Sequence, residues 1–193
     1  MTAAPAVSIL VVCTANQCRS PLTAALLERA LAARGVDAHV RSAGTRALAG
    51  GTVTTGTLDA ARKFDADLSD HATTPLVRGA TQEVDLVIAL AREHVREVVS
   101  VDAGAWRKTF TLKELVRRGT AVGPRAADED LASWLSRVHE GRTARELMGA
   151  AAIDDVEDPT ASTLIDHATM AHEVDDLVRA AVALGWPPRV RVR

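Results

Sequence analysis

A short apolar run near the start of the chain constrains the fold more than any other feature. Residues 6–12 read Ala-Val-Ser-Ile-Leu-Val-Val, a pattern typical of a strand buried on both faces of a parallel sheet. A seven-residue stretch, 13–19, follows as a loop. Ser20 and Pro21 then predict a helix start, with Ser20 as the N-cap and Pro21 at the first helical position. The sequence therefore predicts a unit of strand, loop and helix.

The rest of the chain alternates between the same two kinds of element. Further strands are expected at 36–42, 84–90 and 108–112. Helices are expected at 57–64, 92–100, 113–118 and 128–138, and from Ser162 or Thr163 to Leu184. This alternation predicts an α/β fold, a three-layer sandwich in which helices cover both faces of a four-stranded parallel sheet. Ligands of such folds bind at the carboxyl ends of the strands, where the loop after the first strand lies.

The length and the pattern of the C-terminal half predict a single domain. The 193 residues contain no internal repeat and match the length of one ordinary domain, so we expect 1–193 to fold as one unit. Residues 119–125 are expected to form a linker. In the helix 128–138 that follows, apolar side chains recur at helical spacing and predict one buried face. These side chains are Leu131, Trp134, Leu135 and Val138.

Charge and cysteine content exclude several classes of protein. The 23 Lys and Arg against 25 Asp and Glu give a formal charge of −2, which offers no basis for nucleic-acid or general membrane binding. Two cysteines are too few for a secreted disulfide framework. No segment approaches the roughly 18 apolar residues of a membrane span, and residues 1–5 lack the positive end of a signal peptide. We therefore expect a cytoplasmic protein. Its oligomeric state is not readable from the sequence.

The loop after the first strand has the chemistry of an anion site. It opens a helix, so backbone N–H groups and the positive end of the helix dipole point into it. Arg19 adds a planar, permanently charged fork that suits two phosphate oxygens. Cys13 starts the same loop, and a site that attracts anions also favours a reactive thiolate. The residues alone therefore predict covalent catalysis on a phosphate-like ester.

Four stretches, in order, resemble the low-molecular-weight protein tyrosine phosphatases and together span residues 7 to about 184. The first is Val12-Cys13-Thr14-Ala15-Asn16-Gln17-Cys18-Arg19-Ser20-Pro21, followed by Ser42-Ala43-Gly44-Thr45, Asp67-Leu68-Ser69-Asp70-His71 and Asp155-Val156-Glu157-Asp158-Pro159. The resemblance is to bacterial members of an actinobacterial-like branch. The segment 119–152 looks longer than the compact members of that family need, which makes it an extra helical segment.

The resemblance implies a mechanism for a metal-free phosphomonoesterase. Cys13 would attack phosphorus and form a phosphocysteine intermediate. Backbone N–H groups of the phosphate-binding loop, with the Arg19 side chain, would hold the phosphoryl oxygens. Asp158 would protonate the leaving oxygen and then activate water. Ser20 would donate to the sulfur. The residues of the loop are Thr14, Ala15, Asn16, Gln17, Cys18 and Arg19.

The resemblance also implies supporting residues and partners. Asn16, Ser42 and His71 would form a hydrogen-bond network that fixes the loop. No metal and no cofactor is implied, and the substrate would be a phosphorylated protein or a small aryl phosphate. Cys18 is either a small buried side chain or the partner of Cys13 in a reversible disulfide that protects the nucleophile. Asp154 and Asp155 are expected to be solvated or capping carboxylates.

Two departures from the family pattern bear on the loop and on the substrate. Ala15 stands where the family usually has Gly, which restricts the backbone. Thr160 stands where an aromatic residue is common, and residues 46–56 contain no aromatic side chain. Because aromatic residues make up 3% of the chain, few rings are available for a phosphotyrosine slot. Trp134 is one candidate wall for that slot, although its place on an apolar helix face favours packing.

Two other functions fit the same loop. An arsenate reductase coupled to a low-molecular-weight thiol needs only Cys13, because arsenate resembles phosphate. The thioredoxin-coupled type needs cysteines downstream of Cys18, and the chain has none. Asp158 favours ester hydrolysis, since reduction has no alkoxide leaving group to protonate. A phosphate or phosphoprotein binder without catalysis is the third possibility.

Overall fold

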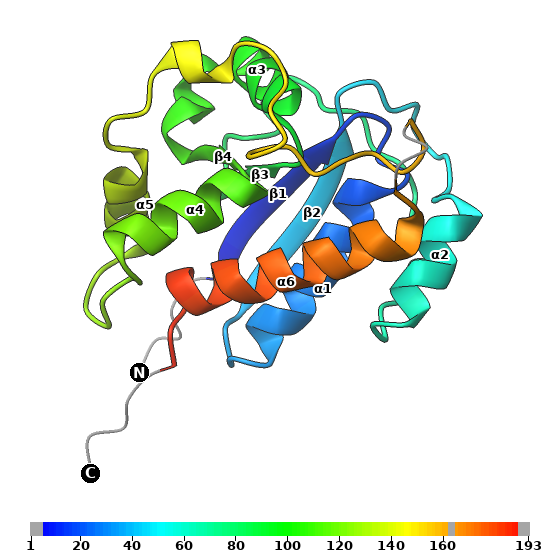
Figure 1. Cartoon of the computed structure of the whole chain (residues 1–193), viewed down its shortest axis with the longest axis horizontal. Helices are drawn as coiled ribbons and strands as arrows, with labels where there is room; N and C mark the ends of the chain where they lie inside the picture. Colours follow the sequence, from blue (N-terminus) through cyan, green and yellow to red (C-terminus); the bar gives the residue numbers. More distant parts are fainter. Residues whose placement is uncertain (1–5, 162–164, 189–193) are drawn as a thin grey trace.

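The computed structural model describes residues 6–161 and 165–188. Within these residues a four-stranded parallel sheet has the strand order β2-β1-β3-β4 (Figure 1). The strands are β1 (Val7–Cys13), β2 (Ala38–Gly44), β3 (Leu86–Ala89) and β4 (Thr109–Thr111). The predicted α/β class and parallel sheet are therefore confirmed, with strand ends that differ from the sequence prediction by one or two residues in most cases.

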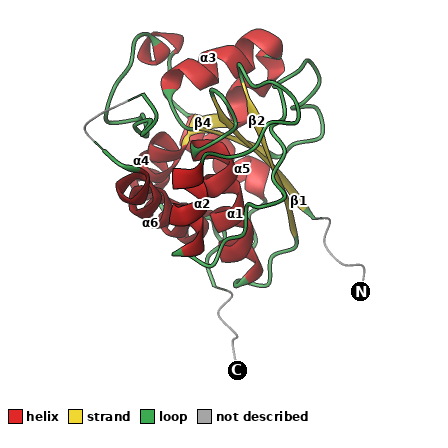
Figure 2. Cartoon of the chain, turned by 90° about the vertical axis from the view of Figure 1, so that its right-hand side faces the viewer, coloured by secondary structure: helices red, strands yellow, loops and turns green. Residues whose placement is uncertain are grey.

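Helices cover both faces of the sheet (Figure 2). Ile9 and Val11 of β1 belong to the larger core cluster, whereas Leu10 and Val12 point to the opposite face and pack with Val98 of α3. This alternation explains why β1 is a continuous apolar run. The helices on the larger side are α1 (Arg19–Ala32), α2 (Thr55–Arg62), α4 (Leu112–Val122), α5 (Leu131–His139) and α6 (His167–Gly185), and α3 (Arg92–Val101) lies on the other side.

The predicted linker at 119–125 is wrong in its first half, because α4 continues through Gly119 to Val122. A Cβ atom at Gly119 would lie 3.2 Å from the ring of Trp134, so the missing side chain lets α4 pack closely on α5. Glycine is a poor helix former, and here tertiary packing overrides that preference. The predicted start of the last helix at Ser162 or Thr163 lies outside the described residues; α6 is described from His167, after an N-cap at Asp166.

A short 3₁₀ turn, η1 (Ala103–Lys108), precedes the segment 119–152, and a second, η2 (Ala144–Leu147), lies within it. The buried side chain of Arg142 holds this segment against η1, β4 and the first turn of α4. The Arg142 guanidinium lies between the rings of Trp106 and Phe110, 4.0 and 4.2 Å from their centroids. It also donates to both carboxylate oxygens of Glu114, at 2.8 and 2.9 Å. Two of the few aromatic rings are thus used to hold a cation in the fold.

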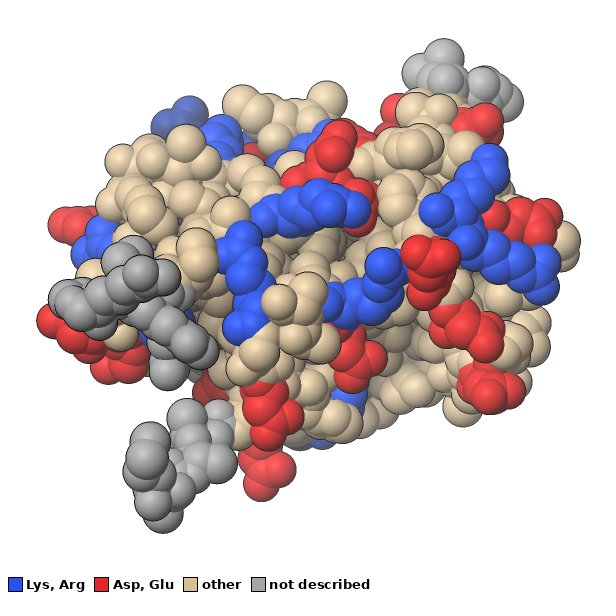
Figure 3. Space-filling model, turned by 90° about the horizontal axis from the view of Figure 1, so that it is seen from below, with Lys and Arg blue, Asp and Glu red and all other residues tan. Residues whose placement is uncertain are grey.

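The surface shows no separation of charge on the face in Figure 3, where Lys and Arg side chains are interspersed with Asp and Glu. This mixture agrees with the formal net charge of −2. Among the described residues, no helix is both long enough and apolar enough to cross a membrane.

Candidate active site

The loop between β1 and α1 folds around the sulfur atom of Cys13. The Oγ atom of Ser20 lies 2.9 Å from Cys13 Sγ, and the backbone N–H of Asn16 donates to the same sulfur at 3.3 Å. Cys13 is 2% exposed and lies at the carboxyl end of the strand. A backbone N–H and a hydroxyl group beside one sulfur can stabilise it as a thiolate, the form that acts as nucleophile and as leaving group.

The start of α1 differs from the prediction in a way that serves this sulfur. The helix begins at Arg19, its N-cap is Cys18, and no side chain caps it. Ser20 is therefore not the N-cap. Its hydroxyl instead contacts Cys13 and accepts from the Asn16 side-chain amide at 2.9 Å. Because the first helical N–H groups have no side-chain cap, they remain available to an anion in the loop.

Arg19 joins the loop to Asp158. Its Nη2 lies 2.6 Å from Asp158 Oδ2, and its Nη1 donates to the carbonyl of Val156 at 3.1 Å. The Arg19 side chain is 5% exposed. Burial raises the pKa of Asp158, but the Arg19 guanidinium and hydrogen bonds from Thr160 outweigh it, so that the pKa lies below its ordinary value. In the structure, Asp158 is therefore an ionised carboxylate paired with Arg19.

A second ion-pair cluster fixes the segment that carries Asp158. Asp155 is expected from the sequence to be solvated or capping, and its side chain accepts from the backbone N–H of Arg92 at 2.8 Å, at the start of α3, which is the capping alternative. The prediction for Asp154 is wrong, because this residue is 3% exposed. It accepts from the Arg92 side chain at 2.7 Å and from Arg117 at 2.9 Å. Burial opposes ionisation, but the two arginines lower the pKa of Asp154 below its usual range.

Asn16 is the centre of the predicted supporting network. Its backbone has a φ of +57°, in the left-handed region that Asn tolerates better than most residues. The Asn16 side chain donates to Ser42 Oγ at 2.8 Å, and its backbone carbonyl lies 2.9 Å from His71 Nε2. Its Oδ1 accepts from the backbone N–H of Thr74 at 2.8 Å, a contact the sequence did not indicate. The structure thus brings Asn16, Ser42 and His71 together.

The Ala at position 15 is compatible with the loop. Among the described non-glycine residues, positive φ angles occur at Asn16 and Asp65, so Ala15 does not need the conformational freedom of glycine. Glycine is required instead at Gly44, at the end of β2. A Cβ atom there would lie 2.6 Å from the carbonyl oxygen of Thr14 and 2.8 Å from the backbone nitrogen of Asn16. The motif Ser42–Thr45 therefore makes room for the loop.

Cys13 and Cys18 are both free and buried. Burial raises the pKa of the Cys18 thiol to about 11, and contact with Thr57 offsets this only in part. Cys18 is therefore a neutral thiol near pH 7. Its predicted disulfide with Cys13 stays a prediction.

The aromatic residues do not form a wall at Cys13. Trp134 is fully buried, its ring packs on Gly119 and Gly185, and its indole N–H donates to the carbonyl of Gly123. Trp134 is thus a packing residue, as its helix position favours. In residues 46–56, which the resemblance places at the wall of a slot, the exposed large apolar side chain is the aliphatic Leu48, 85% exposed.

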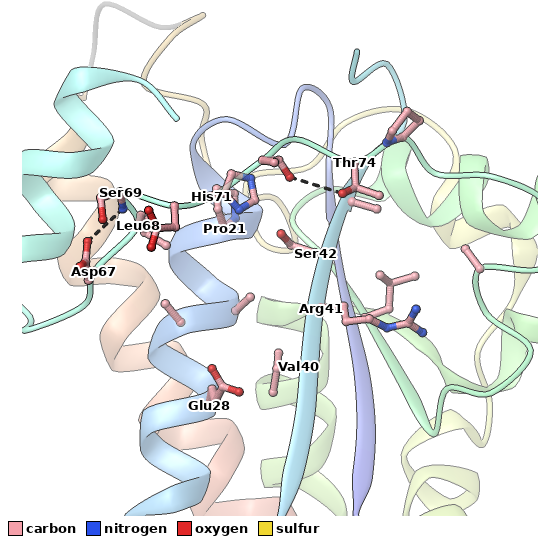
Figure 4. A pocket seen from close by; sticks show the side chains of 18 of the residues that line it. Pro21, Glu28, Val40, Arg41, Ser42, Asp67, Leu68, Ser69, His71 and Thr74 are labelled. Carbon is pink, nitrogen blue, oxygen red and sulfur yellow. Dashed lines mark hydrogen bonds between the residues drawn. The ribbon is translucent and has the colours of Figure 1, made fainter. Parts of the chain in front are cut away.

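A groove of about 770 Å³ lies beside the edge strand β2 (Figure 4). Ser42, His71 and Thr74 line it, so it reaches the supporting network from outside the sheet. Cys13, Arg19 and Asp158 do not line this groove. Its size therefore does not mark the position of the nucleophile. Within the described part of the chain, no three His, Cys, Asp or Glu side chains gather in a group that could hold a metal ion.

One residue at the loop was missed by the sequence analysis. His94, in the first turn of α3, is 1% exposed, and its Nε2 lies 2.9 Å from the Thr14 hydroxyl. The sequence does contain an indication that His94 lies near the loop. His94 follows the apolar run 84–90 by four residues, and β3 is the neighbour of β1 in the sheet. Residues that follow these two strands meet at one edge.

Comparison with known proteins gives a family match over the first part of the chain. Residues 8–122 match the family described as low molecular weight phosphotyrosine protein phosphatase. A protein-arginine-phosphatase from Bacillus subtilis is 36% identical over 110 residues, which cover 56% of this chain and 71% of that protein. The low molecular weight protein-tyrosine-phosphatase Etp from Escherichia coli is 31% identical over 123 residues, or 64% of this chain and 80% of the relative.

Solved structures extend the likeness over nearly the whole chain. A low molecular weight protein tyrosine phosphatase from T. tengcongensis superposes with a TM-score of 0.68 at 26% identity, over 92% of this chain and 98% of the other. A YwlE mutant from Bacillus subtilis gives a TM-score of 0.66 at 25% identity, over 91% and 95% of the two chains. The family match ends before Asp158, so the position of that carboxyl at the site rests on its contact with Arg19.

Proposed function

The chain belongs to the low molecular weight phosphotyrosine protein phosphatase family, and on that premise we propose that it hydrolyses phosphotyrosine in proteins through a phosphocysteine intermediate. Like the other members of that family it is a hydrolase. One observation carries the proposal: Cys13 Sγ lies between the Ser20 hydroxyl and the Asn16 backbone N–H, in a loop that ends at a buried arginine paired with a carboxyl group. These are the parts that a covalent phosphoryl transfer requires.

In the first step Cys13 Sγ attacks phosphorus. The S–P bond forms, the bond from phosphorus to the leaving oxygen breaks, and Asp158 gives its proton to that oxygen. The Arg19 guanidinium and the N–H groups of residues 14–19 hold the other phosphoryl oxygens, where negative charge develops. The loop supplies these donors without rearrangement because Asn16 is fixed by its contacts with Ser42, His71 and Thr74.

In the second step water attacks the phosphocysteine. Asp158, now ionised, takes a proton from the water, the O–P bond forms and the S–P bond breaks. Cys13 leaves as a thiolate, and Ser20 Oγ, 2.9 Å away, donates a hydrogen bond to it. Inorganic phosphate is then released and Arg19 returns to Asp158.

The ion pair between Arg19 and Asp158 links substrate binding to the protonation of Asp158. An incoming phosphate competes with the Asp158 carboxylate for the guanidinium. Once displaced, this half-buried carboxyl has lost its cation and gained a neighbouring anion, and both changes raise its pKa. Substrate binding therefore prepares Asp158 to hold the proton that the leaving group needs.

Phosphoarginine in proteins is a second candidate substrate. The observation that favours it is the 36% identity with a protein-arginine-phosphatase, together with the absence of aromatic side chains from residues 46–56. An arginine side chain is flexible and needs no aromatic wall. The same chemistry applies, with Asp158 protonating a guanidine nitrogen in place of a phenolic oxygen.

The decisive experiment is turnover of an aryl phosphate in the presence of a chelator. We expect hydrolysis that vanadate blocks and that Cys13→Ser abolishes. Full activity of that variant would exclude the proposed nucleophile. Arsenate-dependent consumption of a small thiol, without ester hydrolysis, would establish the reductase alternative. Parallel assays on peptides that carry phosphotyrosine or phosphoarginine decide between the two substrate classes by the ratio of kcat/KM.

A further inference from the structure

His94 is a buried polar side chain that the mechanism above does not use. It begins α3 at the carboxyl end of β3, and its ring is 1% exposed. Its Nε2 lies 2.9 Å from Thr14 Oγ1, and its Nδ1 has no partner among the described residues. A buried unpaired nitrogen is uncommon in folded proteins and needs a reason.

The surroundings of the ring decide which nitrogen carries the proton. Nε2 also lies 3.3 Å from Oε1 of Glu93, a carboxylate that only accepts hydrogen bonds. The proton therefore belongs on Nε2, and Nδ1 is the bare acceptor. Charged groups around the ring are Arg19, Arg96, Asp158 and Glu93. Burial, with Arg19 and Arg96, lowers the pKa of His94 to about 3, so the ring is neutral near pH 7.

This tautomer determines what the Thr14 hydroxyl can do. Thr14 Oγ1 accepts from His94 Nε2–H and also from Arg19 Nη2, at 3.3 Å. Both lone pairs of the oxygen are then used, so its own proton is available only as a donor. Among the described residues no acceptor receives that proton. Thr14 belongs to the phosphate-binding loop, so a bound phosphoryl group supplies the missing acceptor.

We propose that His94 is a positioning residue for phosphoryl transfer, which fixes the Thr14 hydroxyl as a hydrogen-bond donor to the phosphoryl group or the leaving atom in the loop. The inference rests on the proposed function. It adds a side-chain donor to the backbone donors of the loop. One hydrogen bond of this kind that strengthens as charge develops contributes about tenfold to the rate.

The test is a mutant cycle with an aryl phosphate as substrate. Thr14→Val removes the hydroxyl at constant shape, and His94→Met removes the ring donor. Each is expected to lower kcat/KM about tenfold, and Thr14→Val/His94→Met is expected to be no slower than Thr14→Val. His94→Gln places an amide N–H near the position of Nε2 and should recover most of the loss. Unchanged kinetics of the single variants, or losses that multiply in the double variant, would overturn the proposal.

Two measurements separate this proposal from general effects on the fold. Urea unfolding of His94→Gln and His94→Met should give equal midpoints, so that a difference in kcat cannot come from stability.

Nitrogen-15 NMR of the His94 ring in the wild-type protein should show a neutral Nε2–H tautomer from pH 5 to 9. A ring that titrates near pH 6.5 or carries its proton on Nδ1 would contradict the assignment. If wild-type protein hydrolyses no phosphate ester, the proposed function fails, whereas normal hydrolysis with silent His94 variants refutes this inference alone.

Discussion

Arg19 and Asp158 are 139 residues apart in the sequence, yet the Arg19 Nη2 and Asp158 Oδ2 atoms lie 2.6 Å apart in the structure. One residue ends the phosphate-binding loop and the other lies on the segment between η2 and α6. In the proposed mechanism, the Asp158 carboxylate occupies the Arg19 guanidinium until a phosphate displaces it. This contact leads to predictions for turnover, for anion binding with its proton uptake, and for the side chains that hold the loop and the Asp158 segment in place.

Asp158→Ala is expected to slow turnover and to tighten anion binding. Loss of the general acid should lower kcat by about 10²–10³. Because the carboxylate no longer competes for Arg19, inorganic phosphate should bind severalfold more tightly than to the wild type. Steady-state kinetics and calorimetric titration with phosphate measure the two effects. Weaker phosphate binding with normal turnover would mean that Asp158 orients the arginine and is not the acid.

Anion binding is expected to take up a proton at mildly acidic pH. Arg19 holds the pKa of Asp158 below its ordinary value in the free enzyme, and a bound dianion reverses this effect. Between the two pKa values, binding should add up to about one proton. Sulfate is the suitable probe because it does not itself titrate there. Calorimetry at pH 5 in buffers of different ionisation enthalpy measures the uptake, and Asp158→Asn should abolish its Asp158 part. Equal uptake by this variant would exclude Asp158 as the group that titrates.

Asp154→Asn is expected to destabilise the fold by about 3 kcal/mol, because it leaves Arg92 partly buried without its anion. Pairing lowers the pKa of Asp154 relative to the unfolded chain. Its contribution is therefore complete above about pH 5 and is lost as the pH falls through the folded pKa. Urea unfolding at pH 7 and pH 4 measures both effects. The control is Asp59→Asn in an exposed pair with Arg62, which should change stability by less than about 0.5 kcal/mol. Equal effects of the two variants would contradict the buried role.

Asn16→Ala is expected to reduce kcat/KM by about 10². The change removes the amide that Ser20 and Ser42 contact, and it places alanine at a positive φ, which costs about 1 kcal/mol. Asp65→Ala is the matched control, since Asp65 has a φ of +50° but lies outside the network. Both variants should lose similar stability from backbone strain, and only Asn16→Ala should lose activity. A comparable loss of activity in the control would show that the network is not what matters.

Cys18 is expected to react slowly with thiol reagents. With a pKa of about 11, roughly one Cys18 thiol in a thousand is ionised at pH 8. In Cys13→Ser, which retains Cys18 as its remaining cysteine, a disulfide reagent should give no fast phase at pH 8 until denaturant is added. A stoichiometric fast reaction in the folded variant would show that Cys18 is a reactive thiol in its own right.

Local patterns were enough to predict the sheet and the nucleophile loop. The run 6–12 is apolar at every position but Ser8, because β1 has helices on both faces, so its burial is visible in the sequence itself. Cys13 and Arg19 are six residues apart around a single turn, and a spacing this short leaves few geometries. The predicted ends of the four strands also lie within one or two residues of the observed ends.

Features that depend on distant contacts were predicted less well. Gly119 reads as a break, but it continues α4 because Trp134 packs against its bare Cα. Ser20 reads as an N-cap, but its hydroxyl is directed to the Cys13 sulfur. Asp154 reads as a surface carboxylate, and two arginines from α3 and α4 bury it. In each case the local preference is worth about 1 kcal/mol or less, and a tertiary contact outweighs it.

The sequence by itself determined that a strand, a loop and a helix would place Cys13 and Arg19 at an anion site, because these residues are neighbours in the chain and obey local geometry. Only the tertiary structure decided that Arg19 pairs with Asp158, that Thr74 joins the side chains around Asn16, and that the ring of His94 contacts the hydroxyl of Thr14. Those contacts join residues from different strands and helices. The distances between these residues depend on how the strands and helices pack together, and residue spacing along the chain does not reveal that packing.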